Sequence, residues 1–209
     1  NRAPAKVQSA LLEAMGEHQV TVGRVTYRLP QLFLVMATQN PIEQEGTYPL
    51  PEAQLDRFLV KVVIDYPSLE DERRVVSEVT AQAGGKGVDP RQVEQVCNSE
   101  IIIEAQRLTA QAKVVPEVID YALRMTRHTR EAPGLSLGAG TRGAISLVQL
   151  AKAYAVIEGR DYVIPDDIKR AAIPVFRHRV HVAPEVAISG QRVDDLLIQA
   201  LESVEAPRN

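Results

Sequence analysis

The chain has 209 residues, 45% of them hydrophobic, with a formal net charge of −3 and one cysteine. This length suits one large domain or two small ones, and the hydrophobic content can supply a core, which excludes a disordered chain. The charge is evenly spread, with 6 basic and 7 acidic side chains in residues 1–65 and 18 and 20 in residues 66–209, which argues against a nucleic-acid-binding surface.

The single cysteine, Cys97, excludes an internal disulfide framework and a cysteine-rich zinc cluster. It is expected to be a small buried apolar residue in a reducing compartment, which predicts the cytoplasm. No apolar run of about 18 residues or more is present, so no membrane span is predicted. The chain opens directly before a helix, without an initiator methionine, and is expected to be part of a longer protein.

The first predicted elements are a helix and a hairpin. Apolar residues recur at helical spacing in residues 4–16, with proline at an early position and Gly16 as the expected stop. Residues 19–29 alternate in hydrophobicity, and Gly23-Arg24 between two valines is typical of a type II′ turn. We therefore expect an amphipathic helix followed by a β-hairpin.

Two short apolar runs, residues 32–37 and 58–64, are typical of strands buried on both faces of a parallel sheet. Asn40 follows the first run at a polar corner, and ligands bind beyond the carboxyl ends of such strands. The alternative is that Asn40 only satisfies local backbone groups before a proline. Two strands and one helix do not complete a sheet, so residues 1–65 are interpreted as part of an α/β core.

Residues 66–209 have helical patterns, with a loop over residues 132–140 and no strand signal of comparable strength. The predicted fold class is therefore α/β plus all-α, with a boundary near Tyr66. Gly159 is expected to terminate the longest helix with a left-handed conformation. The predicted helices are residues 69–83, 90–96, 99–112, 116–130, 142–158, 165–176 and 192–204.

Residues 138–143 match the G-x-G-x-x-G pattern, but a dinucleotide site is disfavoured because no clear strand precedes them and the next element is helical. Arg142 lies in the first turn of the predicted helix, after a plausible Thr141 N-cap. A cation there opposes the helix dipole at a cost of several tenths to about 1 kcal/mol, which a bound phosphate would reverse. A surface arginine paired with a carboxylate is an equally supported interpretation.

Arg57 has the same two interpretations. It can pair with Asp56 or Glu52 at a domain edge, or it can be an exposed phosphate-sensing group, since its charge is permanent and its donors are forked. His178 and His181 have helical i, i+3 spacing, but a metal site is disfavoured because no third ligand has convincing spacing.

Five stretches together resemble the MoxR family of AAA+ ATPases, and the resemblance spans nearly the whole chain. The most specific stretch is EGTYPLPEAQLDRF, residues 45–58, and the helical half is looser. The other four are NRAPAKVQSALLEAM at residues 1–15, ATQNP at 37–41, GRDYV at 159–163 and RHRV at 177–180.

The resemblance implies an enzyme that uses ATP and Mg²⁺ to remodel or assemble partner proteins. It implies a ring, expected to be a hexamer, working with partners that contain a von Willebrand factor A domain. By resemblance the candidate catalytic and nucleotide-binding residues are Asn40 as sensor 1, Arg57 as the arginine finger and Arg142 as sensor 2 on a helical lid. The hairpin at residues 19–29 resembles the pre-sensor 1 insert.

The sequence departs from the family in lacking a G-x-x-x-x-G-K-[ST] phosphate loop and the Asp-Glu pair of Walker B. By resemblance the chain begins just after Walker B, so the full-length protein is expected to hydrolyse ATP and these 209 residues alone are not. Ile164 stands where the family often has a capping Thr, which weakens that cap. The alternatives are a non-enzymatic helical interaction module and a nucleic-acid-remodelling AAA+ ATPase, against which the charge distribution counts.

Overall fold

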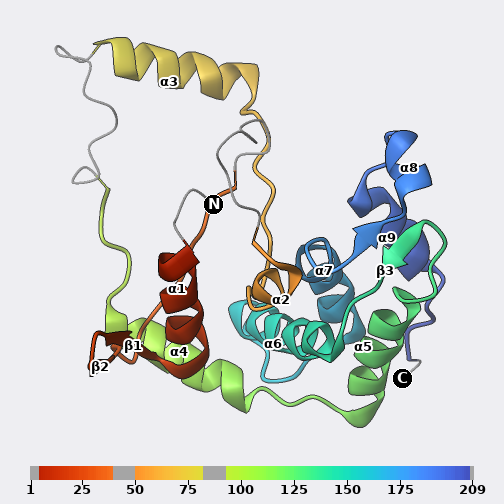
Figure 1. Ribbon diagram of the computed structural model, residues 1–209, viewed down its shortest axis with the longest axis horizontal. Coiled ribbons are helices and arrows are strands. Elements are labelled where there is room, and N and C mark those ends of the chain that lie inside the picture. The colour runs from red at the N-terminus through yellow and green to blue at the C-terminus, as the bar shows by residue number, and fades with distance from the viewer. Residues whose placement is uncertain (1–4, 40–49, 82–92, 208–209) are drawn as a thin grey trace.

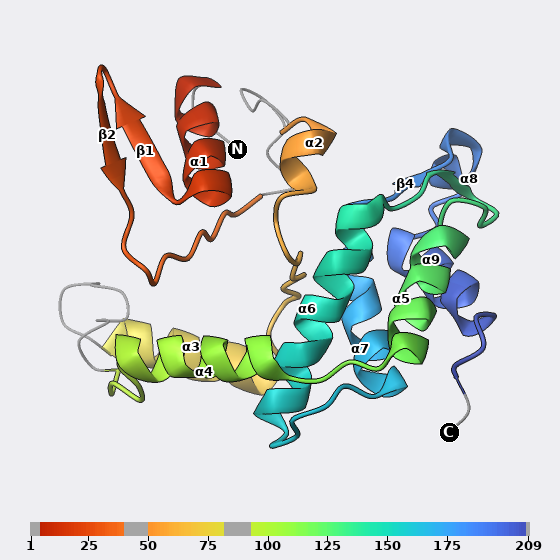
Figure 2. The ribbon, with the colours of Figure 1, turned by 90° about the horizontal axis from the view of Figure 1, so that it is seen from below.

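The structure, a computed structural model, describes residues 5–39, 50–81 and 93–207. Four helices of its C-terminal part pack side by side and form what we call the helical bundle (Figures 1 and 2). The bundle consists of α5 (Pro116–His128), α6 (Thr141–Ile157), α7 (Pro165–Phe176) and α9 (Val193–Glu202). The other elements are α1 (Ala5–Glu17), β1 (Gln19–Val22), β2 (Val25–Arg28), α2 (Glu52–Leu55), α3 (Leu69–Ala81), α4 (Ser99–Gln111), β3 (Leu135–Leu137), β4 (His181–Val182) and α8 (Pro184–Ile188).

The helical bundle contains the main hydrophobic core, and each of its helices supplies side chains to it. Tyr121 of α5, Leu147 of α6, Phe176 of α7 and Leu197 of α9 are fully buried and belong to one cluster. The apolar spacing predicted α7 with its observed bounds and α6 within one residue at each end. Gly159 follows α6 with φ +75°, as its predicted role in helix termination requires.

Three short elements of the C-terminal part, β3, β4 and α8, were not predicted. Within the expected loop over residues 132–140, β3 pairs antiparallel with β4, joining Leu135 to Val182 and Leu137 to His181. The five-residue helix α8 follows β4. A strand of two or three residues has no period that could be recognised locally, because its partner lies more than 40 residues away in the chain.

The N-terminal helix and hairpin are as predicted, with one correction. Gln19 pairs with Arg28 and Val22 with Val25, and Gly23 has φ +65°, as the first central residue of a type II′ turn requires. The predicted stop at Gly16 was wrong, because α1 continues to Glu17 and ends where His18 takes φ +52°.

The predicted strands at residues 32–37 and 58–64 are not strands in the described structure. Both segments have irregular backbone without a neighbouring strand, and the sheets of the described residues are the antiparallel pairs β1-β2 and β3-β4. Strand formation needs hydrogen bonds to another strand, and the described residues offer none to these runs. Several of their apolar side chains are exposed instead, with Met36 at 85% and Ile64 at 91%, whereas Val60 packs against the core of the helical bundle.

The segment between the two regions contains α3 and α4. Ser68 caps α3, since its Oγ accepts the Asp71 N–H at 3.2 Å and donates to the Asp71 carboxylate at 2.7 Å. Helix α3 buries no residue and lies apart from the other helices (Figure 1). The helix predicted over residues 90–96 was wrong in its described part, since residues 93–98 are not helical, and α4 starts after an Asn98 cap. Among the described helices none is long and apolar enough to cross a membrane.

Candidate functional site

Of the three predicted site residues, the structure describes Arg57 and Arg142, and Asn40 lies outside the described residues. Arg57 lies in the turn that follows helix α2. Its backbone N–H donates to the Gln54 carbonyl at 3.2 Å, so α2 positions this residue. The Arg57 side chain is exposed. Its Nη1 lies against α1, so close to Gly16 that a Cβ on that glycine would stand 2.9 Å away.

Arg142 lies in the first turn of α6, and its side chain is 51% exposed. Its Nη1 is 3.1 Å from Oδ2 of Asp56, so the structure shows the carboxylate-paired arrangement. Gly140, and not Thr141 as predicted, is the N-cap of α6. Figures 1 and 2 show α2 next to the N-terminal end of α6, which is how Asp56 reaches Arg142. Asp56 directly precedes Arg57 in the chain, so Arg142 of the lid pairs with the residue next to Arg57.

The same carboxylate binds a second arginine, Arg179, which follows α7. The Arg179 side chain is 1% exposed, and burial lowers its pKa while the Asp56 carboxylate opposes that shift. The pairing keeps the guanidinium charged, because an uncompensated charge at this depth would be costly. Its donors reach six oxygens: Asp56 Oδ1 (2.9 Å), Asp56 O (3.0 Å), Phe58 O (2.6 Å), Leu59 O (3.1 Å), Val175 O (2.6 Å) and Ser146 Oγ (3.1 Å).

Arg177 and Pro174, which are close to Arg179 in the chain, also form hydrogen bonds with the stretch that follows Asp56. Arg177 donates to the Lys61 carbonyl at 3.3 Å and pairs with Asp194 of α9 at 2.8 Å. The Lys61 N–H donates to the Pro174 carbonyl at 2.9 Å. Residues 56–61, which we call the 56–61 segment, are therefore fastened to the C-terminal end of α7 although they are not in a strand.

His178 completes this attachment in its neutral form. Its Nε2 lies 3.0 Å from the Phe58 carbonyl, which can only accept, so Nε2 carries the hydrogen. Nδ1 is buried without a described partner. The His178 pKa is lowered from 6.5 to about 4, chiefly by burial; the charges of Arg179 and Lys61 act in the same direction, and the Phe58 carbonyl and Asp56 oppose the shift.

Two of the three glycines in the G-x-G-x-x-G stretch, Gly138 and Gly143, have close neighbours at this site. A Cβ on Gly138 would lie 2.5 Å from the backbone of Arg130, where the loop crosses the end of α5 and the Ala139 N–H donates to Thr129 Oγ1 at 2.9 Å. A Cβ on Gly143 would lie 3.5 Å from Cδ of Arg179. These glycines therefore allow the start of α6 to approach α5 and Arg179 closely.

Two minor expectations concern His181 and Cys97. His178 faces the Phe58 carbonyl, whereas Nδ1 of His181 lies 3.4 Å from Glu52, so the two histidines do not share a site. The described residues contain no group of three or more potential metal ligands. Cys97 is partly exposed, so the expectation that it is buried was wrong.

Arg179 was not identified as a functional candidate from the residues, where it entered only within the RHRV stretch of the family resemblance. The local signal was available, since two arginines, Arg177 and Arg179, interrupt an apolar run between Phe176 and Val180. Long charged side chains among buried residues indicate specific partners. The partners themselves lie about 120 positions earlier in the chain and could not be found from spacing.

Comparisons with known proteins define the class first. A model of the ATPase family associated with various cellular activities (AAA) matches residues 1–60, and a model of the AAA lid domain matches residues 127–199. A solved structure of a candidate ATPase from Cytophaga hutchinsonii superposes with a TM-score of 0.86 at 38% identity, covering 100% of this chain and 64% of that one. The predicted fold class, a partial AAA+ core followed by a helical lid, is thus confirmed.

Individual relatives define the family. Chaperone MoxR1 of Mycobacterium tuberculosis is 41% identical over 207 residues, which cover 90% of this chain and 53% of that protein. YeaC of Bacillus subtilis is 42% identical, covering 99% and 63%, and MoxR of Methylorubrum extorquens is 32% identical, covering 99% and 64%. The chain belongs to the MoxR family of AAA+ ATPases, and it spans between half and two thirds of the length of these relatives.

Proposed function

We propose that this chain forms the nucleotide-sensing and lid part of an ATPase that couples ATP hydrolysis to the remodelling or assembly of partner proteins. One observation carries the proposal: Arg142 of the lid pairs with Asp56 of the core, the residue that directly precedes Arg57. Two permanent cations at one edge, both accessible to solvent, suit the charge of a phosphoryl group in transfer.

The roles follow the family resemblance residue by residue. Arg57 is the arginine finger, directed to the nucleotide of a neighbouring subunit, and Arg142 is sensor 2. Asn40 is sensor 1, which orients the attacking water. We divide the chain into residues 1–65, the C-terminal part of the AAA+ core, and residues 66–209, the lid domain.

The cofactors are ATP and Mg²⁺, and the described residues fit only part of that requirement. Arg57 and Arg142 offer exposed guanidinium groups to phosphate oxygens, and bound nucleotide would supply the phosphoryl group whose charge they stabilise. The sequence contains neither the phosphate loop that would cradle the nucleotide nor its Mg²⁺-binding hydroxyl. The 209 residues alone are therefore expected not to bind MgATP tightly and not to hydrolyse it.

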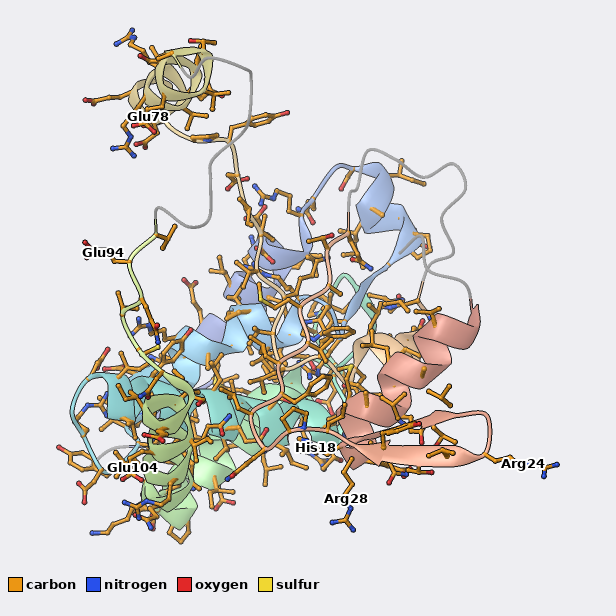
Figure 3. All side chains as sticks on the ribbon, turned by 90° about the vertical axis from the view of Figure 1, so that its left-hand side faces the viewer. His18, Arg24, Arg28, Glu78, Glu94 and Glu104 are labelled. Atoms are coloured by element: carbon orange, nitrogen blue, oxygen red, sulfur yellow. The ribbon has the colours of Figure 1, made fainter. Side chains whose placement is uncertain are left out.

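The partners we propose are further copies of the protein, in a hexameric ring, and proteins that contain a von Willebrand factor A domain. A finger that acts on a neighbouring nucleotide requires such an assembly. The relative named chaperone MoxR1 supports a role in acting on other proteins. The hairpin presents Val22, Val25 and Tyr27 largely exposed, and Figure 3 shows Arg24 and Arg28 extending outward from it, as suits an insert that contacts other chains.

The test is Arg57→Ala in the full-length protein, that is, the chain carrying these residues together with both Walker motifs. We expect turnover to fall about a thousandfold or more, with the Kd for ATP within about twofold of wild type. Mixing this variant with a Walker B variant should restore part of the turnover, because each supplies what the other lacks. Wild-type turnover in Arg57→Ala would remove the finger assignment, and tight Mg²⁺-dependent ATP binding by residues 1–209 would contradict the proposed incompleteness of the site.

A further inference from the structure

We propose that Arg179 is a positioning residue that fixes the direction of Arg57 and the location of the Asp56 carboxylate. This inference rests on the proposed function, since it concerns the arginine finger assigned there. Arg179 lies on the lid side, 122 positions after Arg57, and no nucleotide contact is assigned to it.

The hydrogen bonds of Arg179 join two parts of the chain. Four of the six oxygens that Arg179 reaches belong to the 56–61 segment, and two belong to the helical bundle. A single buried guanidinium therefore fastens the segment to α6 and α7. Such a side chain contributes fixed geometry, because its planar fork has few alternative arrangements once its donors are satisfied.

Arg179 also binds the backbone next to Arg57 itself. The carbonyls of Asp56 and Phe58, the residues on either side of Arg57, both accept from Nη2 of Arg179, at 3.0 and 2.6 Å. This holds the backbone on both sides of Arg57, and the Arg57 side chain is exposed beside Gly16 of α1. A displacement of about 1 Å at a catalytic group can lower the rate about a hundredfold, so turnover depends on a fixed backbone position at Arg57.

Arg179 and Arg142 share the carboxylate of Asp56. Arg179 binds Oδ1 of Asp56 and Arg142 binds Oδ2, at 2.9 and 3.1 Å. The Arg179 side chain is 1% exposed and the Arg142 side chain 51%. The buried arginine thus keeps the carboxylate in place, while the exposed arginine is the one that can exchange Asp56 for a phosphate.

The experiment measures ATPase turnover and ATP affinity of the full-length protein carrying Arg179→Lys. Lysine keeps the charge but has one donor nitrogen, so it cannot reach the segment and the bundle together. We expect turnover to fall about tenfold to a hundredfold, with the Kd for ATP within about twofold. Arg170→Lys is the matched control, since Arg170 is an exposed arginine on α7 that pairs with Glu158, and its turnover should stay within twofold.

A double substitution separates positioning from a general structural role. If Arg179 acts through Arg57, then Arg179→Lys should reduce turnover by less than twofold in an Arg57→Ala background. A full additional loss in that background would overturn the inference. So would wild-type turnover in Arg179→Lys alone. Wild-type turnover in Arg57→Ala would instead defeat the finger assignment, so the two failures are distinguishable.

Asp56→Asn provides a second route in case Arg179→Lys does not fold. It removes the charge that Arg179 and Arg142 share but keeps the side-chain shape and the backbone carbonyls. Turnover should again fall about tenfold or more, and in the Arg57→Ala background the further loss should be smaller, limited to what Asp56 does through Arg142. Unchanged turnover in a folded Asp56→Asn ring would count against the inference as firmly as unchanged turnover in Arg179→Lys.

Discussion

The helical bundle and the N-terminal half of this chain differ in how much of their apolar side-chain surface is buried. In the helical bundle, α5, α6, α7 and α9 surround one core with side chains from all four helices. Among the described side chains of residues 5–39 and 50–65, the only buried hydrophobic one is Ala14. Leu34, Met36 and Ile64 are exposed. The four helices complete most of the bundle core between them, whereas the N-terminal half leaves much of its apolar side-chain surface exposed and contributes Val60 to the edge of the bundle core.

The difference shows what an apolar pattern can determine. A helix satisfies its own backbone hydrogen bonds, so helical spacing plus a packing partner is sufficient. A buried strand needs hydrogen bonds from neighbouring strands, and the described residues contain no strand beside 32–37 or 58–64. The 56–61 segment keeps its place through side-chain and backbone contacts to α7.

The sharpest test of this contrast compares Phe176→Ala with Ile64→Ala in the 209-residue chain. Phe176 is fully buried and Ile64 is 91% exposed. We expect the first change to lower the free energy of unfolding by about 3–5 kcal/mol and the second by less than about 0.5 kcal/mol. Urea denaturation followed by circular dichroism measures both. A large loss in Ile64→Ala would show that the 58–64 run is packed in solution and would break the comparison.

A second test uses two glycines of the same loop. Gly138→Ala places a Cβ 2.5 Å from the Arg130 backbone, whereas a Cβ on Gly140 meets open space. The first change should cost about 1–3 kcal/mol through overpacking and should disturb the start of α6, and the second should be nearly neutral. Thermal unfolding of the two variants measures the difference. Equal effects would contradict the close approach of this loop to α5.

A third test addresses the attachment between the halves through pH. The His178 pKa is lowered from 6.5 to about 4, so the folded state binds fewer protons there than the unfolded state between those values. Its contribution to stability is complete above pH 6.5 and is lost as pH falls towards 4. Between pH 6.5 and 5 the loss should be about 1–2 kcal/mol, allowing for the part of the ring that water reaches.

The control for the pH test is His178→Gln, which keeps a donor for the Phe58 carbonyl and does not titrate. Urea unfolding at pH 7, 6.5, 5.5 and 5 should show a steeper decline for wild type than for this variant. Parallel declines would mean that His178 is not buried as described, and the halves would then be attached less firmly than the structure indicates.

The sequence predicted the parts of the fold that depend on local spacing. It gave α7 its observed bounds, α6 nearly so, the hairpin with its Gly23 turn, and the termination at Gly159. It missed the short pairing of β3 with β4 and assigned a helix to residues 93–96 and strands to 32–37 and 58–64. Each of these errors concerns a conformation set by contacts between segments far apart in the chain.

The site divides in the same way. The sequence singled out Arg57 and Arg142 from their positions before an apolar run and at the start of a helix, and motif resemblance gave them roles. Only the tertiary structure paired Arg142 with Asp56, next to Arg57, and placed the buried Arg179 on the same carboxylate, because the contacts cross 86 and 123 positions of the chain. A guanidinium is the same in every sequence context, and its function depends on which oxygens the fold brings within about 3 Å of it.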